Sequence, residues 1–206
     1  ALRTYEHTLT RSQAQLFLAF VLTCYSTFLQ RIDARAKKRL TWAKDLSFPH
    51  AHFRKNQRAM AGQVYKSIVS GDNLLLEAAT GSGKTLAVLF PALKAQAYDE
   101  QFFFLTSRNR GADAALNAAQ LIAKEDAPLR VVQITAKEKT CPQTEMHCDA
   151  SVCPNAAGYY ARLPAALAAL EQRCIADRSA IESMAAEFSL CPFELSLDSA
   201  MTADLV

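Results

Sequence analysis

The sequence predicts an α/β fold in which helices cover both faces of a parallel sheet. Three short apolar runs, residues 74–76, 102–106 and 129–135, have the length and apolar content of buried strands. Runs rich in alanine and leucine lie between them and favour helices. This alternation of strand and helix is typical of a doubly wound domain, whose ligand lies at the carboxyl ends of the strands.

A glycine-rich loop follows the first apolar run. Residues 77–85 read E-A-A-T-G-S-G-K-T. Gly81 and Gly83 allow backbone conformations in which successive N–H groups point at phosphate oxygens. Lys84 can then reach the β- and γ-phosphates, and the Thr85 hydroxyl can ligate magnesium, at the N-terminus of a helix. The loop therefore predicts a nucleoside triphosphate with magnesium as ligand and Lys84 and Thr85 as catalytic residues.

The first position of this loop departs from the general pattern G-x-x-x-x-G-K-[ST], because Ala78 replaces glycine. A chance glycine turn between a strand and a helix is the alternative interpretation. The residues that the motif predicts to contact nucleotide are Ala78, Ala79, Thr80, Gly81, Ser82, Gly83, Lys84 and Thr85.

Cysteines form the second pattern. Cys141, Cys148, Cys153 and Cys191 have the spacing C-x6-C-x4-C-x37-C. A nucleotide-binding protein points to a reducing compartment, where clustered cysteines bind metal more often than they form disulfides. Cys-Pro steps at three of the four resemble some iron–sulfur motifs, and zinc also accepts four thiolates. Reduced cysteines packed as small apolar side chains remain the third alternative.

The other two cysteines stand apart from this pattern. Cys174 is a spare cysteine of the same region, and Cys24 lies in an apolar helical run, where we expect it to be buried.

Composition limits the class of protein. The 206 residues suffice for one sizeable domain, and a net charge of +3 with a pI of about 8.5 permits a nucleic-acid partner without indicating one. The longest apolar run, residues 16–22, is shorter than the roughly 20 residues that span a bilayer, so no membrane segment is expected. No secretory signal is recognisable, and we expect a cytoplasmic protein.

A long amphipathic helix is predicted before the α/β region. Ser12-x-x-Gln15 has the form of a capping box, and apolar residues recur after it at helical spacing. The helix leads into a basic end, which is most often a solvated face and less often a phosphate-contacting patch. The members of this basic end are Arg31, Arg35, Lys37, Lys38 and Arg39.

Further helices are predicted over residues 54–69, 112–123, 166–173 and 179–188. The domains that we expect are a helical segment (1–47), the first part of the α/β domain (48–140), a mostly helical insert with the cysteines (141–191) and a return to the α/β domain (192–206).

Several of these motifs together resemble the DinG/XPD-like DNA helicases of superfamily 2 over residues 48–206. The motifs are the loop itself, Phe53-Arg54-x-x-Gln57-Arg58, Phe104-Leu105-Thr106-Ser107, Thr135-Ala136-Lys137 and Cys191-Pro192-Phe193. The resemblance implies a RecA-like domain whose insert holds a [4Fe–4S] cluster, and an enzyme that uses ATP and Mg²⁺ to move 5′→3′ along single-stranded or forked DNA, as in DNA repair.

The resemblance also implies roles for individual residues. Arg54 and Gln57 would recognise adenine, and Thr106 and Ser107 would touch the DNA backbone. The cluster ligands would be Cys141, Cys148, Cys153 and Cys191.

Some parts of the family pattern are missing. No D-E-A-H box occurs in the sequence, and no second motor domain with its γ-phosphate arginine follows. We therefore expect a piece of a longer protein, with a further domain upstream, that is inactive as an ATP hydrolase by itself. The alternative function is a P-loop ATPase or a metal-stabilised nucleic-acid-binding module that is not a motor.

Overall fold

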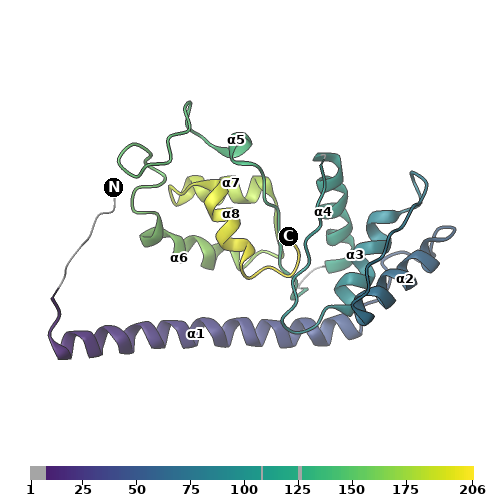
Figure 1. Cartoon of the computed structure of the whole chain (residues 1–206), viewed down its shortest axis with the longest axis horizontal. Helices are drawn as coiled ribbons and strands as arrows, with labels where there is room; N and C mark the ends of the chain where they lie inside the picture. Colours follow the sequence, from purple (N-terminus) through teal and green to yellow (C-terminus); the bar gives the residue numbers. More distant parts are fainter. Residues whose placement is uncertain (1–7, 108, 125–126) are drawn as a thin grey trace.

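The computed structural model describes residues 8–107, 109–124 and 127–206 (Figure 1). A long N-terminal helix lies along one side of the molecule, and the remaining helices form two groups above it. The elements of the described chain are α1 (Arg11–Lys44), α2 (Gln57–Ser70), α3 (Lys84–Ala95), α4 (Asn109–Ala123), β1 (Val131–Val132), α5 (Lys137–Thr140), α6 (Tyr159–Leu170), β2 (Ile175–Ala176), α7 (Arg178–Glu187) and α8 (Pro192–Ala200).

A small parallel sheet lies between the two groups of helices. β1 and β2 pair in parallel, with Val131 opposite Ile175. The C-terminal residues 204–206 extend this sheet, because Val132 N donates to Leu205 O at 3.0 Å. Residues 102–104 pair in parallel with the other side of the C-terminal segment, where Phe104 N donates to Val206 O at 2.8 Å. The lateral order is therefore 102–104, 204–206, β1, β2.

Successive residues of β1 face two different cores. Val131 belongs to a core built from α3, α4 and the end of α1, and Val132 belongs to a core built from α6, α7 and α8. Side chains of a strand alternate between the faces of a sheet, so a two-residue strand can join both cores. Helices thus cover both faces, as the sequence predicts for a parallel sheet.

The expected strands are shorter than their apolar runs. Residues 74–76 form no strand, and Leu75 is 98% exposed. Residues 102–106 make a single isolated bridge at Phe102, and Phe103 and Leu105 are exposed. The expectation of a buried strand was wrong for residues 74–76, because a strand needs hydrogen-bonding neighbours and no described segment pairs with them. For residues 102–106 it holds only in part, because residues 102–104 alone form hydrogen bonds with residues 204–206.

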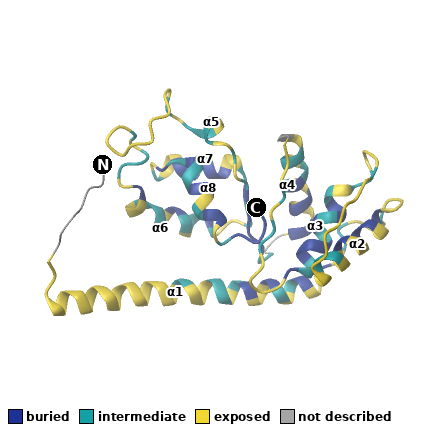
Figure 2. Cartoon of the chain, in the orientation of Figure 1, coloured by how far each residue is buried: buried dark blue, intermediate teal, exposed yellow. Residues whose placement is uncertain are grey.

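The N-terminal half of α1 is exposed along almost its whole length (Figure 2). Thr10 caps the helix in a capping box with Gln13, two residues before the predicted box. Cys24 is exposed, so the expectation that it is buried was wrong. The large apolar residues in this half are exposed as well, Leu16 and Phe20 among them. The apolar pattern identified the helix correctly but not its packing.

α1 is long and apolar enough to cross a membrane, and no other helix in the described part of the chain is. We expected no membrane segment because the longest uninterrupted apolar run covers only residues 16–22. The uncharged stretch is longer, since residues 12–30 contain no charged side chain. Core helices of soluble proteins and signal sequences can have the same length and composition. This helix by itself therefore does not show that the protein is in a membrane.

The basic end of α1 docks on the sheet. Arg39 is 1% exposed and lies beside Asp204, and Arg35 pairs with the same carboxylate. Arg31 pairs with Glu171 at 3.1 Å, and Lys37 pairs with Asp33 within the helix. The interpretation of the basic end as a solvated face or phosphate patch was wrong for the two buried or half-buried arginines, because acidic partners far along the chain neutralise them.

Candidate nucleotide-binding site

The glycine-rich loop joins the exposed segment 74–77 to the N-terminus of α3. Gly81 and Gly83 have φ values of 83° and 79°, in the left-handed region that favours glycine. α3 begins at Lys84, directly after the loop. The loop therefore has the backbone conformation and the following helix N-terminus that a phosphate site requires.

The lysine of the loop folds back onto the loop itself. Lys84 Nζ donates to the carbonyl oxygens of Ala78 at 2.8 Å and of Ala79 at 2.9 Å. Thr85 is half-buried beside it, and the Ser82 hydroxyl oxygen is buried with no hydrogen-bond partner among the described residues. A phosphate would compete with these two carbonyl oxygens for the ammonium group, which already lies at the loop.

Arg54 and Gln57 lie against the same loop. Arg54 Nη1 donates to Gly81 O at 2.6 Å, and Gln57 Nε2 donates to Gly83 O at 3.1 Å. The two residues are also linked, because the Arg54 backbone N donates to Gln57 Oε1 at 2.9 Å. The structure thus brings all the predicted nucleotide-binding residues into one cluster.

The residues expected to touch DNA follow the segment 102–104. Thr106 and Ser107 are exposed at the carboxyl end of this segment. Gly111 lies so close that an added Cβ would be 2.1 Å from Thr106 Oγ1. Gly111 therefore lets the first turns of α4 approach Thr106, which the motif alone did not reveal.

The four cysteines of the predicted cluster are not gathered into a metal site. No group of three or more His, Cys, Asp or Glu side chains among the described residues could hold a metal ion. Cys148 is exposed, and Cys141, Cys153 and Cys191 are half-buried. The arrangement of these thiols in the described chain therefore does not fit a bound cluster. The loop between α5 and α6 would have to rearrange to bring them together.

Lys137 is a residue of this region whose contacts the sequence did not reveal. Its Nζ lies 2.8 Å from Glu194 Oε1, 3.7 Å from Cys148 Sγ and 4.8 Å from the centre of the Phe193 ring. The hydrogen bond that Lys137 donates to Glu194 raises the pKa of Lys137. In the sequence, only its position in the Thr135-Ala136-Lys137 motif indicated that Lys137 could have a role.

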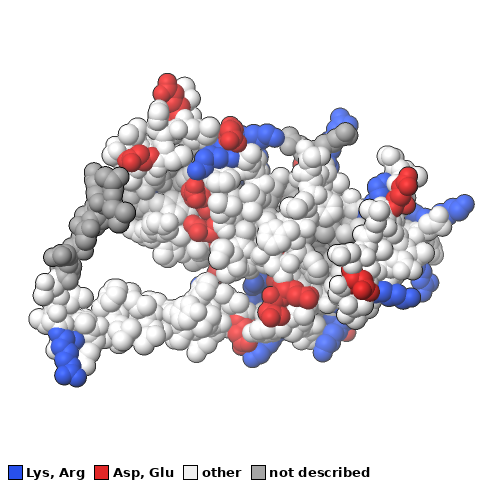
Figure 3. Space-filling model, viewed as in Figure 1, with Lys and Arg blue, Asp and Glu red and all other residues white. Residues whose placement is uncertain are grey.

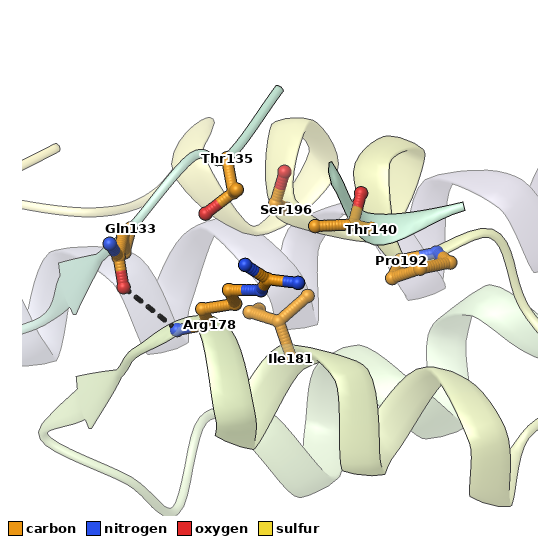
Figure 4. A pocket seen from close by; sticks show the side chains of 7 residues that line it. All are labelled: Gln133, Thr135, Thr140, Arg178, Ile181, Pro192 and Ser196. Carbon is orange, nitrogen blue, oxygen red and sulfur yellow. Dashed lines mark hydrogen bonds between the residues drawn. The ribbon is translucent and has the colours of Figure 1, made fainter. Parts of the chain in front are cut away.

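A narrow pocket lies where residues 133–140, which lead into the loop between α5 and α6, pack against α7 and α8 (Figure 4). The Arg178 backbone N donates to Gln133 Oε1 at 2.9 Å, and the Arg178 side chain donates to Lys139 O. The Thr135 hydroxyl oxygen is buried there without a hydrogen-bond partner among the described residues. Side chains fill this pocket so closely that no room for a ligand remains.

Charge is dispersed over the face shown in Figure 3. Basic and acidic side chains alternate, and the N-terminal half of α1 is almost free of both. The electrostatics of this face thus agree with the modest net charge of +3 and indicate no dominant phosphate-binding stripe.

Comparison with known proteins connects the loop to a family. Residues 57–155 match the DEAD/DEAH box helicase family. Curated proteins and solved structures give no significant match. The matched segment starts at Gln57, includes the whole glycine-rich loop and extends past Cys153. Helicases of this family have a RecA-like P-loop fold and use ATP with Mg²⁺ to act on nucleic acid, which agrees with the small parallel sheet between helices. Residues 57–155 are thus similar to a DEAD/DEAH box helicase domain of superfamily 2.

Proposed function

We propose that this chain forms part of the motor of an ATP-dependent DNA helicase of the iron–sulfur type, acting in the cytoplasm on single-stranded or forked DNA. The direction of movement in this proposal is 5′→3′, and the process served is DNA repair. The family match supports an ATP-driven helicase. The choice of DNA, the direction and the cluster rest on the resemblance of the sequence motifs to DinG/XPD-like enzymes.

The observation that carries the proposal is the phosphate loop. Two glycines with left-handed φ precede a helix N-terminus, and the ammonium group of Lys84, the first residue of that helix, lies against the loop. Partial positive charge and free N–H groups at the start of α3 favour a polyphosphate anion. In this proposal Lys84 binds the β- and γ-phosphates and Thr85 ligates Mg²⁺.

The nucleic-acid side of the proposal uses Thr106 and Ser107. Both residues are exposed after a segment of the sheet. Hydroxyl side chains that contact phosphate fix the position of the strand without reading its sequence. Binding should therefore be insensitive to base sequence.

The cluster remains part of the proposal although the described thiols are not gathered. It is supported by the order of Cys141, Cys148, Cys153 and Cys191 and by their position outside the two main cores, except for Cys191, which packs at the edge of one. A bound cluster would supply a rigid link across the insert. The residues that would hold it are these four thiolates.

Nucleotide binding by the Lys84→Ala variant tests the loop. A fluorescent ATP analogue with Mg²⁺ should bind the unmodified chain and not this variant, because the variant lacks the ammonium group at the β- and γ-phosphates. Lys66→Ala is the matched control, since Lys66 is exposed on α2 away from the loop. Equal binding by both variants would remove the basis of the proposal.

Substrate choice is tested with the complete protein. Strand displacement on forked duplexes with a 5′ or a 3′ single-stranded tail should occur only with the 5′ tail. ATP hydrolysis without displacement of any strand would favour the P-loop ATPase that is not a motor.

A further inference from the structure

We propose that the N-terminal half of α1 pairs with the same half of a second copy of the chain, in the antiparallel direction, and that the chain is a dimer through this helix. The inference concerns a surface that the nucleotide site does not use, and it does not depend on nucleotide binding.

The N-terminal half of α1 exposes a large apolar surface (Figure 2). Its exposed large apolar side chains are Leu16, Phe17, Leu18, Phe20, Val21, Leu22, Tyr25 and Leu29. Together they expose on the order of 800 Å², taking about 150–220 Å² for each fully exposed side chain. The largest apolar patch on a monomeric protein is typically about 300–600 Å². Two copies together supply about the 1,600 Å² that a stable interface covers.

Apolar residues form a seam along one side of this half. Steps of three and four residues lead from Ala14 through Phe17, Val21 and Cys24 to Phe28. This spacing keeps the side chains on one side of a helix and is the pattern that packs against a second helix. The residues on the opposite side are Ser12, Gln15, Ala19, Thr23, Ser26 and Gln30. The helix therefore has an apolar side for a partner and a polar side for water.

The seam continues the side of α1 that already packs against the folded body. The next two steps of the same spacing reach Arg31 and Arg35, and both pair with acidic residues of the body. Further toward the N-terminus the same side lacks comparable cover, since Phe17 is 63% and Val21 40% exposed. The second copy would thus extend an interface that the chain begins by itself.

Charges at the two ends of the seam favour an antiparallel pair. Residues 12–30 contain no charged side chain, so two copies can approach without repulsion. An antiparallel seam places Val21 opposite the second copy's Cys24, which brings Arg11 within one turn of the second copy's Asp33. A parallel pair in register would instead place the basic residues 31–39 of both copies side by side. The antiparallel direction also keeps the two folded bodies at opposite ends of the pair, because each body packs on the C-terminal half of α1.

A membrane is the other occupant whose dimensions match this stretch. Residues 12–30 are about 28 Å long, close to the thickness of the hydrocarbon core. However, Gln15 and Gln30 are exposed on the polar side, and their amides would need partners inside hydrocarbon. Arg31 also lies 3.1 Å from Glu171, so folded protein adjoins the end of the stretch. A second helix on the seam leaves the polar side in water and therefore fits better.

Sedimentation equilibrium of the chain tests the dimer. The unmodified chain should dimerise at micromolar concentration. Val21→Glu should weaken the dimer about a hundredfold or more, because it places two unpaired carboxylates at the centre of the seam. Ala19→Glu is the matched control, since it adds the same charge on the polar side of the same helix and should leave the dimer unchanged. Both residues are exposed in the single chain, so both variants should fold, which thermal unfolding checks.

Alkylation of Cys24 gives a second readout without any change to the seam. Cys24 and Cys148 are both exposed in the single chain. In dilute solution, where single chains predominate, Cys24 should react readily. As the concentration rises, its rate should fall relative to that of Cys148 in the unmodified chain and in Ala19→Glu, but not in Val21→Glu. An unchanged ratio of the two rates at all concentrations would contradict burial of the seam.

The direction of the pair is tested by cross-linking in a Cys24→Ser background. The antiparallel seam places Phe17 opposite the second copy's Phe28. A mixture of Phe17→Cys and Phe28→Cys chains should therefore form a disulfide-linked dimer on mild oxidation, beyond the level of the background chain. Neither variant should do so alone. Cross-linking of Phe17→Cys chains with each other would indicate a parallel pair and overturn the inference.

Vesicle flotation separates a second copy from a membrane. The unmodified chain should remain free of vesicles of phosphatidylcholine and phosphatidylglycerol. Vesicle binding that Val21→Glu abolishes would assign the surface to a membrane instead. A chain that stays monomeric throughout the micromolar range, or a dimer that Ala19→Glu and Val21→Glu weaken equally, would overturn the inference as well.

Discussion

Arg39 Nε lies 3.0 Å from Asp204 Oδ1, and both residues are buried. They are 165 positions apart in the sequence: Arg39 lies on α1, and Asp204 lies in the C-terminal segment 204–206 of the sheet. Arg35 pairs with the other oxygen of the same carboxylate, which also accepts from the Arg130 backbone N at 2.7 Å. One carboxylate thus joins the N-terminal helix, the strand segment that carries it and the residue before β1. Burial lowers the pKa of Arg39, and the charge of Asp204 opposes this shift.

The first prediction concerns the stability of this junction. Asp204→Asn keeps the shape of the side chain and removes its charge, which leaves Arg39 without a counter-charge in the interior. Breaking a buried ion pair on one side typically costs about 3 to 5 kcal/mol of unfolding free energy. Chemical denaturation of the variant should show a loss of this size.

Asp33→Asn is the matched control. Asp33 pairs with Lys37 on the exposed side of α1, where water screens the ion pair. Its replacement should leave the denaturation midpoint nearly unchanged. Equal midpoints for the two variants would contradict a structural role for the buried pair.

The second prediction is nucleotide binding without turnover. The chain supplies a phosphate loop but no D-E-A-H box, and so lacks the carboxylate that would hold magnesium and orient the attacking water. ATP should bind with Mg²⁺, and steady-state phosphate release should not exceed the background of the Lys84→Ala variant. Magnesium-dependent hydrolysis that disappears in this variant would show that other residues supply the acid.

The third prediction identifies the ligands of the proposed cluster. Four thiolates hold a four-iron cluster. In single Cys→Ser variants prepared anaerobically, iron content and visible absorbance should fall for Cys141, Cys148, Cys153 and Cys191. The Cys24 and Cys174 variants should keep both.

The weakest of these assignments is Cys148, which lacks the Cys-Pro step. Iron lost in the Cys174 variant and kept in the Cys148 variant would show that Cys174, and not Cys148, is the fourth ligand. A colourless protein that contains zinc would instead establish a zinc site, because zinc is not coloured.

The fourth prediction is the order in which thiols react in the metal-free chain. Cys24 and Cys148 are exposed, and Cys174 is half-buried among core residues. Burial raises the pKa of the Cys174 thiol, which lowers the fraction of reactive thiolate at neutral pH. Mass spectrometry after brief alkylation should find Cys24 and Cys148 modified first and Cys174 last. Early modification of Cys174 would indicate that the core around it opens.

Local features of the chain could be predicted from the sequence alone. Gly81, Ser82, Gly83 and Lys84 are contiguous, so the spacing itself specifies a phosphate loop that leads into a helix. The helices predicted over 54–69 and 112–123 correspond to α2 and α4, because helical hydrogen bonds join residues four apart and depend mainly on nearby sequence. The proximity of Arg54 and Gln57 to the loop followed only from the family resemblance.

Features that depend on distant partners were decided by the tertiary structure. Strand formation at Val131 requires hydrogen-bonding neighbours from residues 204–206 and from β2. The periodicity of the sequence does not show which segments these neighbours are. Residues 74–76 have the same apolar character and remain exposed, since no segment among the described residues pairs with them. Cys24 is exposed and Arg39 is buried on one helix, because burial depends on what packs against each turn and not on the polarity of the residue itself.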